Sequence, residues 1–201
     1  MTKPTARLEF WYEFASTYSY LSAMRVETLA ANAGVAVAWK PFLLGPIFHA
    51  QGWNTSPFNL YPAKGKYMVR DVTRLATERG LPFKMPSPFP QNGLQAARLA
   101  LIGHTEGWGP AFTRAVYTAQ FAEGAQISDR HALGAILHSL SLDAEAIFAR
   151  AGQQETKDHL RQQNEEAQEL GIFGAPSFLV GTELFWGDDR LEQAVAKARS
   201  G

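Results

Sequence analysis

The sequence predicts an α/β fold in which one small sheet, built from both ends of the chain, carries an all-helical insertion between its two halves. Three observations predict it. The first 42 residues show the pattern strand, helix, strand, and the last part of the chain shows strand, strand, helix. Between them, residues 66–170 show helical patterns without a strand pattern. Because neither end is large enough to be stable alone, both must contribute to one sheet.

The N-terminal part supports this in order. Apolar side chains alternate with their neighbours over residues 7–14, which is the period-two pattern of a strand. Residues 17–33 carry an apolar face with helical spacing, and Gly34 is the expected end of that helix. Residues 35–42 alternate again, so the unit is a right-handed βαβ motif.

The middle of the chain has a different composition. Gly, Pro and Asn are frequent in residues 43–65, which predicts a long loop. Residues 66–80 form a helical pattern that ends at a glycine, and residues 81–93 hold four prolines, which exclude a helix or a central strand. Further helical patterns follow at residues 94–102, 110–121, 129–137, 143–151 and 155–170.

Strand patterns return only in residues 175–187. Two apolar runs there are joined by Gly181-Thr182, a hairpin-type link, and Asp188-Asp189 then begin a last helix. This is a thioredoxin-type arrangement. We therefore expect a discontinuous thioredoxin-like domain, residues 1–45 and 172–201, and an inserted loop and helical domain, residues 46–171.

Composition narrows the classes of function. The 201 residues contain 19 Lys and Arg against 19 Asp and Glu, a net charge of zero, which argues against nucleic acid or an acidic membrane as partner. No segment has the length of a signal peptide's apolar region or a membrane span, so we expect a cytoplasmic protein. The chain has no cysteine, which excludes redox chemistry on its own thiols, and its five histidines lack metal-ligand spacing, so no metal is expected.

Three short segments lie at ends of the predicted sheet. Ser16 follows the first strand and begins a helix, where its hydroxyl can cap the helix or donate a hydrogen bond to a thiolate brought by a ligand such as glutathione. Ala175-Pro176 begins a strand and can present backbone groups to an extended peptide. Gly187, Asp188 and Asp189 suit the γ-glutamyl end of glutathione, or they only cap the last helix.

The stretches "FWYEFASTYSYLS", "PAKGKYMVRDVTRLATERGLPFKMPSPFP", "FGAPSFLV" and "FWGDDRL" together resemble 2-hydroxychromene-2-carboxylate isomerases and their relatives, the kappa-class glutathione transferases. The resemblance covers nearly the whole chain. It implies a thioredoxin domain with a helical insertion, a homodimer, glutathione as cofactor and a small aromatic substrate. The implied reaction interconverts 2-hydroxychromene-2-carboxylate and trans-o-hydroxybenzylidenepyruvate in aromatic hydrocarbon breakdown, through transient thiolate addition.

The resemblance also implies roles for particular residues. Ser16 is similar to the family's catalytic serine, which holds the sulfur of glutathione, and Ala175-Pro176 is similar to a cis-proline turn that pairs with the tripeptide's cysteinyl backbone. Residues matching those that hold the rest of glutathione are Asn54, Trp186, Gly187, Asp188 and Asp189. Residues on the substrate side are Asn59, Lys64 and Phe89, and Tyr18 can line an aromatic pocket.

One segment departs from the family pattern. Where isomerases carry Asn, Tyr and Arg near the substrate's carboxylate, this chain has Phe89, Gln91 and Asn92, with no arginine before Arg98. The aromatic substrate therefore stays open. Two other functions also stay open: a kappa-like glutathione transferase acting on another electrophile, and a non-catalytic thioredoxin-like module that binds extended peptides along the Pro176 edge.

Overall fold

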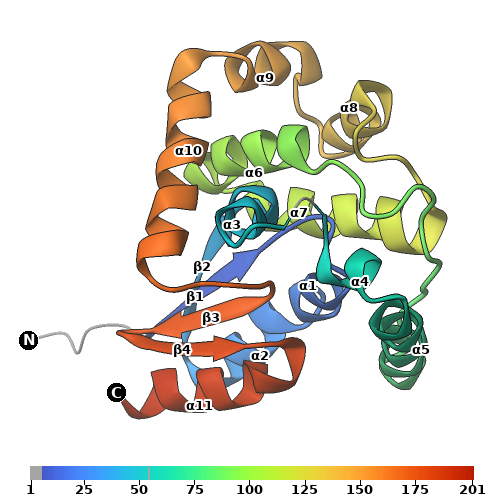
Figure 1. Ribbon diagram of the computed structural model, residues 1–201. Helices are drawn as coiled ribbons and strands as arrows, with labels where there is room; N and C mark the ends of the chain where they lie inside the picture. The colour runs from blue at the N-terminus through green and yellow to red at the C-terminus, as the bar shows by residue number, and fades with distance from the viewer. Residues whose placement is uncertain (1–5, 54) are drawn as a thin grey trace, which may run out of the picture.

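The structure, a computed structural model, describes residues 6–53 and 55–201. At its centre lies a sheet with strand order β2-β1-β3-β4, and helices cover it above and below (Figure 1). Strand β1 (Arg7–Tyr12) pairs in parallel with β2 (Ala36–Pro41) and antiparallel with β3 (Ser177–Val180). Strand β4 (Glu183–Trp186) completes the sheet as the hairpin partner of β3. The predicted α/β fold, with one sheet built from both chain ends, is confirmed.

The predicted helix of residues 17–33 is divided into α1 (Thr17–Ala23) and α2 (Val26–Ala33). Gly34 ends α2 with φ of 69°, as its position in the sequence indicated. The division falls at Arg25, whose guanidinium group donates to the backbone oxygen of Asp188 and forms an ion pair with Glu192. Since the sequence contains no helix breaker there, this division depends on tertiary contacts.

The prediction that residues 43–65 form a loop is wrong. They contain α3 (Leu44–Ala50), α4 (Pro57–Leu60) and the start of α5 (Pro62–Glu78). Pro57 and Pro62 stand at the first position of α4 and α5, where a helix needs no N–H group, and Pro46 lies in the first turn of α3. In addition, the Ser56 hydroxyl accepts the Phe58 N–H and so caps α4.

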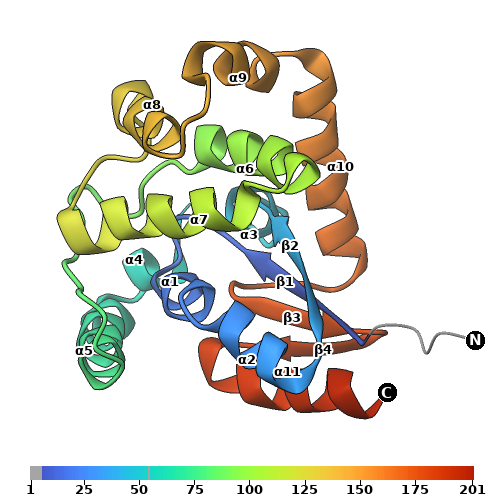
Figure 2. The same ribbon diagram turned by 180° about the vertical axis from the view of Figure 1, so that it is seen from behind.

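The remaining helices agree with the sequence patterns to within a few residues. They are α6 (Leu94–Glu106), α7 (Gly109–Thr118) with a π-helical turn η1 (Ala119–Glu123), α8 (Arg130–Ser139), α9 (Ala144–Ala151) and α10 (Gln154–Glu169). A short 3₁₀ turn η2 (Asp188–Arg190) leads into the last helix, α11 (Leu191–Ser200). Viewed from behind, α6 and α7 lie above the sheet while α2 and α11 lie below it (Figure 2).

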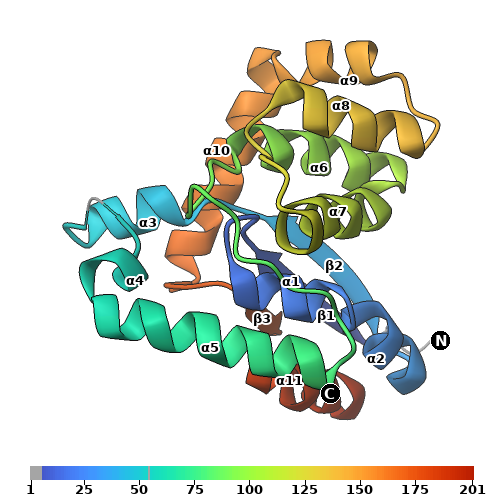
Figure 3. The same ribbon diagram turned by 90° about the vertical axis from the view of Figure 1, so that its right-hand side faces the viewer.

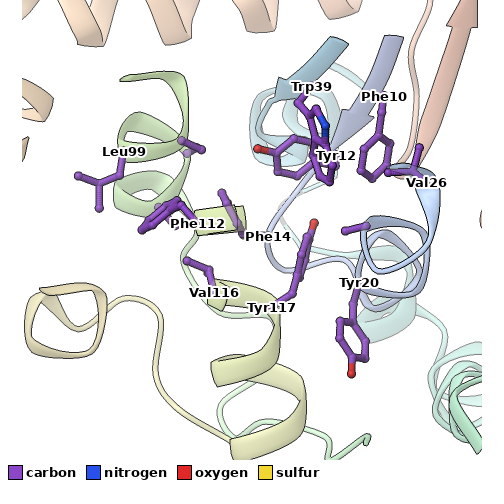
Figure 4. Close-up of a cluster of buried hydrophobic side chains, with 14 of the residues drawn as sticks. Phe10, Tyr12, Phe14, Tyr20, Val26, Trp39, Leu99, Phe112, Val116 and Tyr117 are labelled. Carbon is purple, nitrogen blue, oxygen red and sulfur yellow. The ribbon is translucent and has the colours of Figure 1, made fainter. Parts of the chain in front are cut away.

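The hydrophobic core joins the sheet to the helical insertion. Phe10 and Tyr12 of β1 belong to the same buried cluster as Phe112 and Tyr117 of α7 (Figure 4). On the opposite face of β1, Trp11 packs in a second cluster with residues of α3, α10 and β3. Both faces of β1 are covered because the helical insertion packs on one face, and α3 and α10 pack on the other. The domain boundaries given above stay a prediction.

Candidate active site

A large cavity opens at the end of β1, where the chain turns into α1. Its walls come from five parts of the chain: the corner at residues 13–18, the α3–α5 segment, residues 89–93, and the turns at 173–176 and 186–190. Figure 3 shows α3, α4 and α5 along one side of the molecule, with α1 next to α5. The cavity volume is about 1670 Å³, larger than the ~300–1,000 Å³ usual for one small ligand. It therefore has room for a tripeptide together with a second molecule.

Most of the predicted site residues meet in this cavity. Those that line it are Ser16, Lys64, Phe89, Ala175, Pro176, Trp186, Gly187, Asp188 and Asp189. Asn59 does not line it; this residue is exposed on α4, and its amide donates to the Thr55 hydroxyl. Asn54 lies outside the described residues.

Ser16 forms two hydrogen bonds at the corner. Its Oγ accepts the backbone N–H of Ser19 at 3.1 Å, so the capping role weighed from the sequence is confirmed. The same hydroxyl donates to the backbone oxygen of Ala175 at 2.9 Å, across the cavity floor. Since a hydroxyl has one proton, a ligand that accepts from Ser16 has to replace Ala175 as acceptor.

The turn at Ala175-Pro176 contains a cis peptide bond. The Pro176 oxygen accepts the Gly187 N–H at 3.0 Å, which joins this turn to the end of β4. The backbone N–H of Ala175 donates no hydrogen bond to any group within residues 6–53 and 55–201. An extended peptide in the cavity can therefore find a backbone donor at this edge.

The two adjacent aspartates have different surroundings. Asp188 is buried, with Oδ2 2.7 Å from an Arg79 nitrogen and Oδ1 2.8 Å from the Ser22 hydroxyl. Arg25 lies 3.5 Å from the same Oδ1. The Asp188 carboxylate is thus already paired within the protein, whereas the Asp189 side chain is 71% exposed and lies 3.3 Å from Arg190. Of the two, Asp189 is the carboxylate available to a ligand's ammonium group.

Helix α5 supplies a wall that sequence reasoning largely missed. Lys64, Met68, Asp71 and Leu75 line the cavity, and their spacing of three and four residues places them on one helical face. The Asp71 carboxylate accepts the Tyr18 hydroxyl at 2.9 Å, and burial together with this carboxylate raises the pKa of Tyr18. That spacing was the signal in the sequence that could have found this wall.

Glu13 is a second residue that the sequence analysis did not select. It lies three residues before Ser16, lines the cavity and is only 8% exposed. Burial raises the pKa of its carboxyl group to about 7, although the N–H of Ala15 donates to it at 3.0 Å. The cavity therefore contains an acid that changes charge near neutral pH.

Comparison with known proteins places the chain in a family. Residues 7–198 match the DsbA-like thioredoxin domain, and the chain belongs to that family. A 2-hydroxychromene-2-carboxylate isomerase of Sphingobium xenophagum is 31% identical over 94% of this chain and 95% of its own length. Glutathione S-transferase kappa 2 of Caenorhabditis elegans is 25% identical over 94% of this chain and 89% of its own length. These relatives support an enzyme.

The solved structures give the same fold. A 2-hydroxychromene-2-carboxylate isomerase superposes with a TM-score of 0.84 at 26% identity, covering 94% of this chain and 93% of its own. A probable DsbA oxidoreductase of Streptomyces coelicolor has a TM-score of 0.76 at 21% identity, over 96% of this chain and 90% of its own. Because this chain has no cysteine, its residues cannot carry out thiol–disulfide exchange.

The described part of the chain has neither a membrane-spanning helix nor a cluster of metal-ligating side chains. No helix there is both long and apolar enough to cross a bilayer. Likewise, no group of three or more His, Cys, Asp or Glu side chains among these residues is arranged to hold a metal ion.

Proposed function

We propose that this protein is a glutathione-dependent isomerase that interconverts 2-hydroxychromene-2-carboxylate and trans-o-hydroxybenzylidenepyruvate. The observation that carries the proposal is the meeting of Ser16, the Ala175-Pro176 turn and Asp189 at one cavity large enough for a cofactor and a substrate. Relatives named for the isomerase, one of them 31% identical over nearly the whole chain, support the reaction.

The residues present fit glutathione. The N–H of Ala175 suits the carbonyl of an extended cysteinyl residue, and the exposed carboxylate of Asp189 suits the γ-glutamyl ammonium group. The Ser16 hydroxyl suits the sulfur, because an O–H donor stabilises a thiolate more than a thiol. When bound there, glutathione would supply a thiolate that adds reversibly to the substrate's conjugated double bond and so permits rotation about it.

The other side of the cavity suits an anionic aromatic substrate. Phe89 and Tyr18 contribute aromatic surface, and the Lys64 ammonium group lies 4.8 Å from the centre of the exposed Tyr61 ring. Lys64 forms no ion pair among the described residues, so its charge is available to a substrate carboxylate. In this proposal Asn59 has no contact with substrate. A role for Asn54 over the glutathione is retained as part of the proposal.

A kappa-like glutathione transferase is the second candidate. It is favoured by relatives named glutathione S-transferase kappa, which are 23–25% identical over more than nine-tenths of this chain. It would use the same glutathione residues. The two functions differ in the fate of the thiol, because an isomerase regenerates free glutathione and a transferase consumes it. The proposal further includes a homodimer, which light scattering tests, and a cytoplasmic location in a cell that degrades aromatic compounds.

The test uses wild type, Ser16→Ala and a matched control, Asp143→Ala. Asp143 caps α9 through the Ala146 N–H and does not line the cavity, so the control also loses a helix cap. Calorimetry measures glutathione binding, and far-ultraviolet absorbance measures the bound thiolate. Conversion of 2-hydroxychromene-2-carboxylate is followed with and without glutathione, and the concentration of free glutathione is measured at the end of the reaction.

We expect glutathione-dependent conversion with the thiol fully recovered. Ser16→Ala should lower turnover about 10- to 100-fold, as expected for loss of a hydrogen bond to a charged group, and should reduce the thiolate signal, while Asp143→Ala leaves both unchanged. Loss of free glutathione in proportion to product would instead identify the transferase. If wild type neither binds glutathione nor converts the substrate, the proposed function is wrong.

A further inference from the structure

Glu13 occupies an unusual place for a carboxyl group. It follows the last residue of β1 and is almost completely buried, yet it contributes to the cavity wall. The Ala15 N–H donates to Oε2, which fixes the side chain against the turn that leads to Ser16. Its other oxygen, Oε1, receives no hydrogen bond from residues 6–53 or 55–201. One carboxyl oxygen is therefore anchored and the other is free for a ligand.

The free oxygen lies on the substrate side of the cavity. A Cβ atom added to Gly93 would stand 3.1 Å from Oε1, so this carboxyl oxygen lies against the residue 89–93 segment, where the glycine leaves room for it. Both Phe89 and Gly93 line the cavity. Glu13 thus faces the part of the cavity that the proposed function assigns to the aromatic substrate.

Among residues 6–53 and 55–201, no positively charged side chain pairs with Glu13. Its neighbours include Phe14 and Ala15 on its own segment, the residue 89–93 segment, which has no ionisable side chain, and Tyr117 of α7, beside Phe14 in Figure 4. The Tyr117 hydroxyl donates to the backbone oxygen of Glu13 at 2.9 Å and not to the carboxyl group. No Lys, Arg or His of the described chain forms an ion pair with Glu13. Burial without a counter-charge keeps the acid protonated up to about neutral pH.

The proposed substrate requires such a group. Opening of the cyclic hydroxychromene carboxylate needs one proton to leave its hydroxyl group and one to arrive on the ring oxygen. An acid that is partly ionised at neutral pH serves both steps, because it can accept a proton and then return it. The Ser16 hydroxyl cannot do this, since an unassisted serine is far too weak an acid.

We propose that Glu13 is the proton-transfer group of this cavity, and this inference rests on the proposed function. The Glu13 carboxylate takes the proton of the substrate's hydroxyl group through Oε1. The carbon–oxygen bond of the ring then breaks, its electron pair stays on the ring oxygen, and a carbonyl group forms at the carbon. Glu13 returns its proton to the ring oxygen, so the opened substrate and the enzyme leave with no net change in protons.

The experiment compares wild type, Glu13→Gln, Glu13→Asp and the matched control Glu9→Gln from about pH 5 to about pH 9. Glu9 is on the same strand but does not line the cavity. In wild type and the control, kcat should change through an ionisation near pH 7. Glu13→Gln should lower kcat at least about 100-fold, with KM changed less than about threefold, and should remove that ionisation. Glu13→Asp should restore part of kcat.

The outcomes separate this inference from the proposed function. Glu13→Gln should still bind glutathione with the wild-type thiolate absorbance, because the carboxyl group lies on the substrate side. If wild type is active and Glu13→Gln retains its turnover and pH profile, Glu13 transfers no proton and this inference is wrong while the proposed function stands. If wild type shows no glutathione-dependent conversion at all, the proposed function is wrong, and so is the reaction assigned to Glu13.

Discussion

The adjacent carboxylates Asp188 and Asp189 allow a sharp separation of folding from binding. We expect Asp188→Asn to destabilise the protein strongly, whereas Asp189→Asn leaves its stability unchanged and weakens glutathione binding. The two substitutions are chemically identical and one residue apart. Any difference between them therefore reports the surroundings of the side chain and not the type of change.

The magnitude follows from the contacts of Asp188. Its carboxylate lies within 2.7 Å of Arg79, 2.8 Å of Ser22 and 3.5 Å of Arg25. An asparagine would remove the charge that compensates two guanidinium groups and would direct an amide donor at another donor. Removing one partner of a buried ion pair costs about 3–5 kcal/mol. Since both arginine side chains are 21–22% exposed, we expect a value near the lower end, about 3 kcal/mol.

Urea denaturation followed by tryptophan fluorescence measures this difference, and the melting temperature should fall by about 6–12 °C. Asp189→Asn should lie within about 0.5 kcal/mol of wild type, because its side chain is mostly exposed. Its affinity for glutathione should fall about tenfold, since a charge-assisted hydrogen bond is lost. If Asp188→Asn is as stable as Asp189→Asn, the buried network does not stabilise the fold and the reasoning is refuted.

Three further predictions concern the cavity wall. The Glu13 pKa lies above its unfolded value of 4.5, so the folded state binds this proton more tightly. Its contribution to the free energy of unfolding should fall by about 3 kcal/mol between about pH 4.5 and pH 7, and Glu13→Gln should not show this fall. If the free energy of unfolding of wild type and of Glu13→Gln changes equally with pH in urea denaturation, this prediction is wrong. Gly174→Ala would place a Cβ atom 2.4 Å from the Trp186 ring nitrogen, so it should displace that ring. A crystal structure of the variant with Trp186 in its wild-type position would contradict this prediction. Ser16→Ala should cost about 1 kcal/mol of stability, and an unchanged urea midpoint would show that the α1 cap is unimportant.

Much of the architecture was predictable because it depends on local patterns. Alternation in the strands, apolar faces at helical spacing, and the position of Gly34 predicted element type and order. The loop predicted for residues 43–65 was wrong because frequent Gly, Pro and Asn were interpreted as a loop composition, whereas Pro57 and Pro62 stand at the first position of a helix, where proline is tolerated. Composition alone could not distinguish these two placements.

The candidate site was predictable where a residue's position in the chain places it at a sheet end. Ser16, the Ala175-Pro176 turn and residues 186–189 were found in this way, and they line one cavity. The α5 wall and Glu13 were not selected. A glutamate in an alternating strand pattern is expected on a solvated face. This one is buried because it follows the end of β1 and lies against the distant Gly93, which the local pattern does not show.

By itself, the sequence determined the element order, the shared sheet and the absence of any thiol of the protein's own. It also determined which backbone corners could receive a ligand, because strand ends and helix starts follow from local pattern. Only the tertiary structure decided that Asp188 is buried among arginines while Asp189 is mostly exposed, and that Glu13 is a buried acid with no ion-pair partner in the described part of the chain. Charge pairing and burial depend on which distant segments come together, and a linear pattern does not contain those distances.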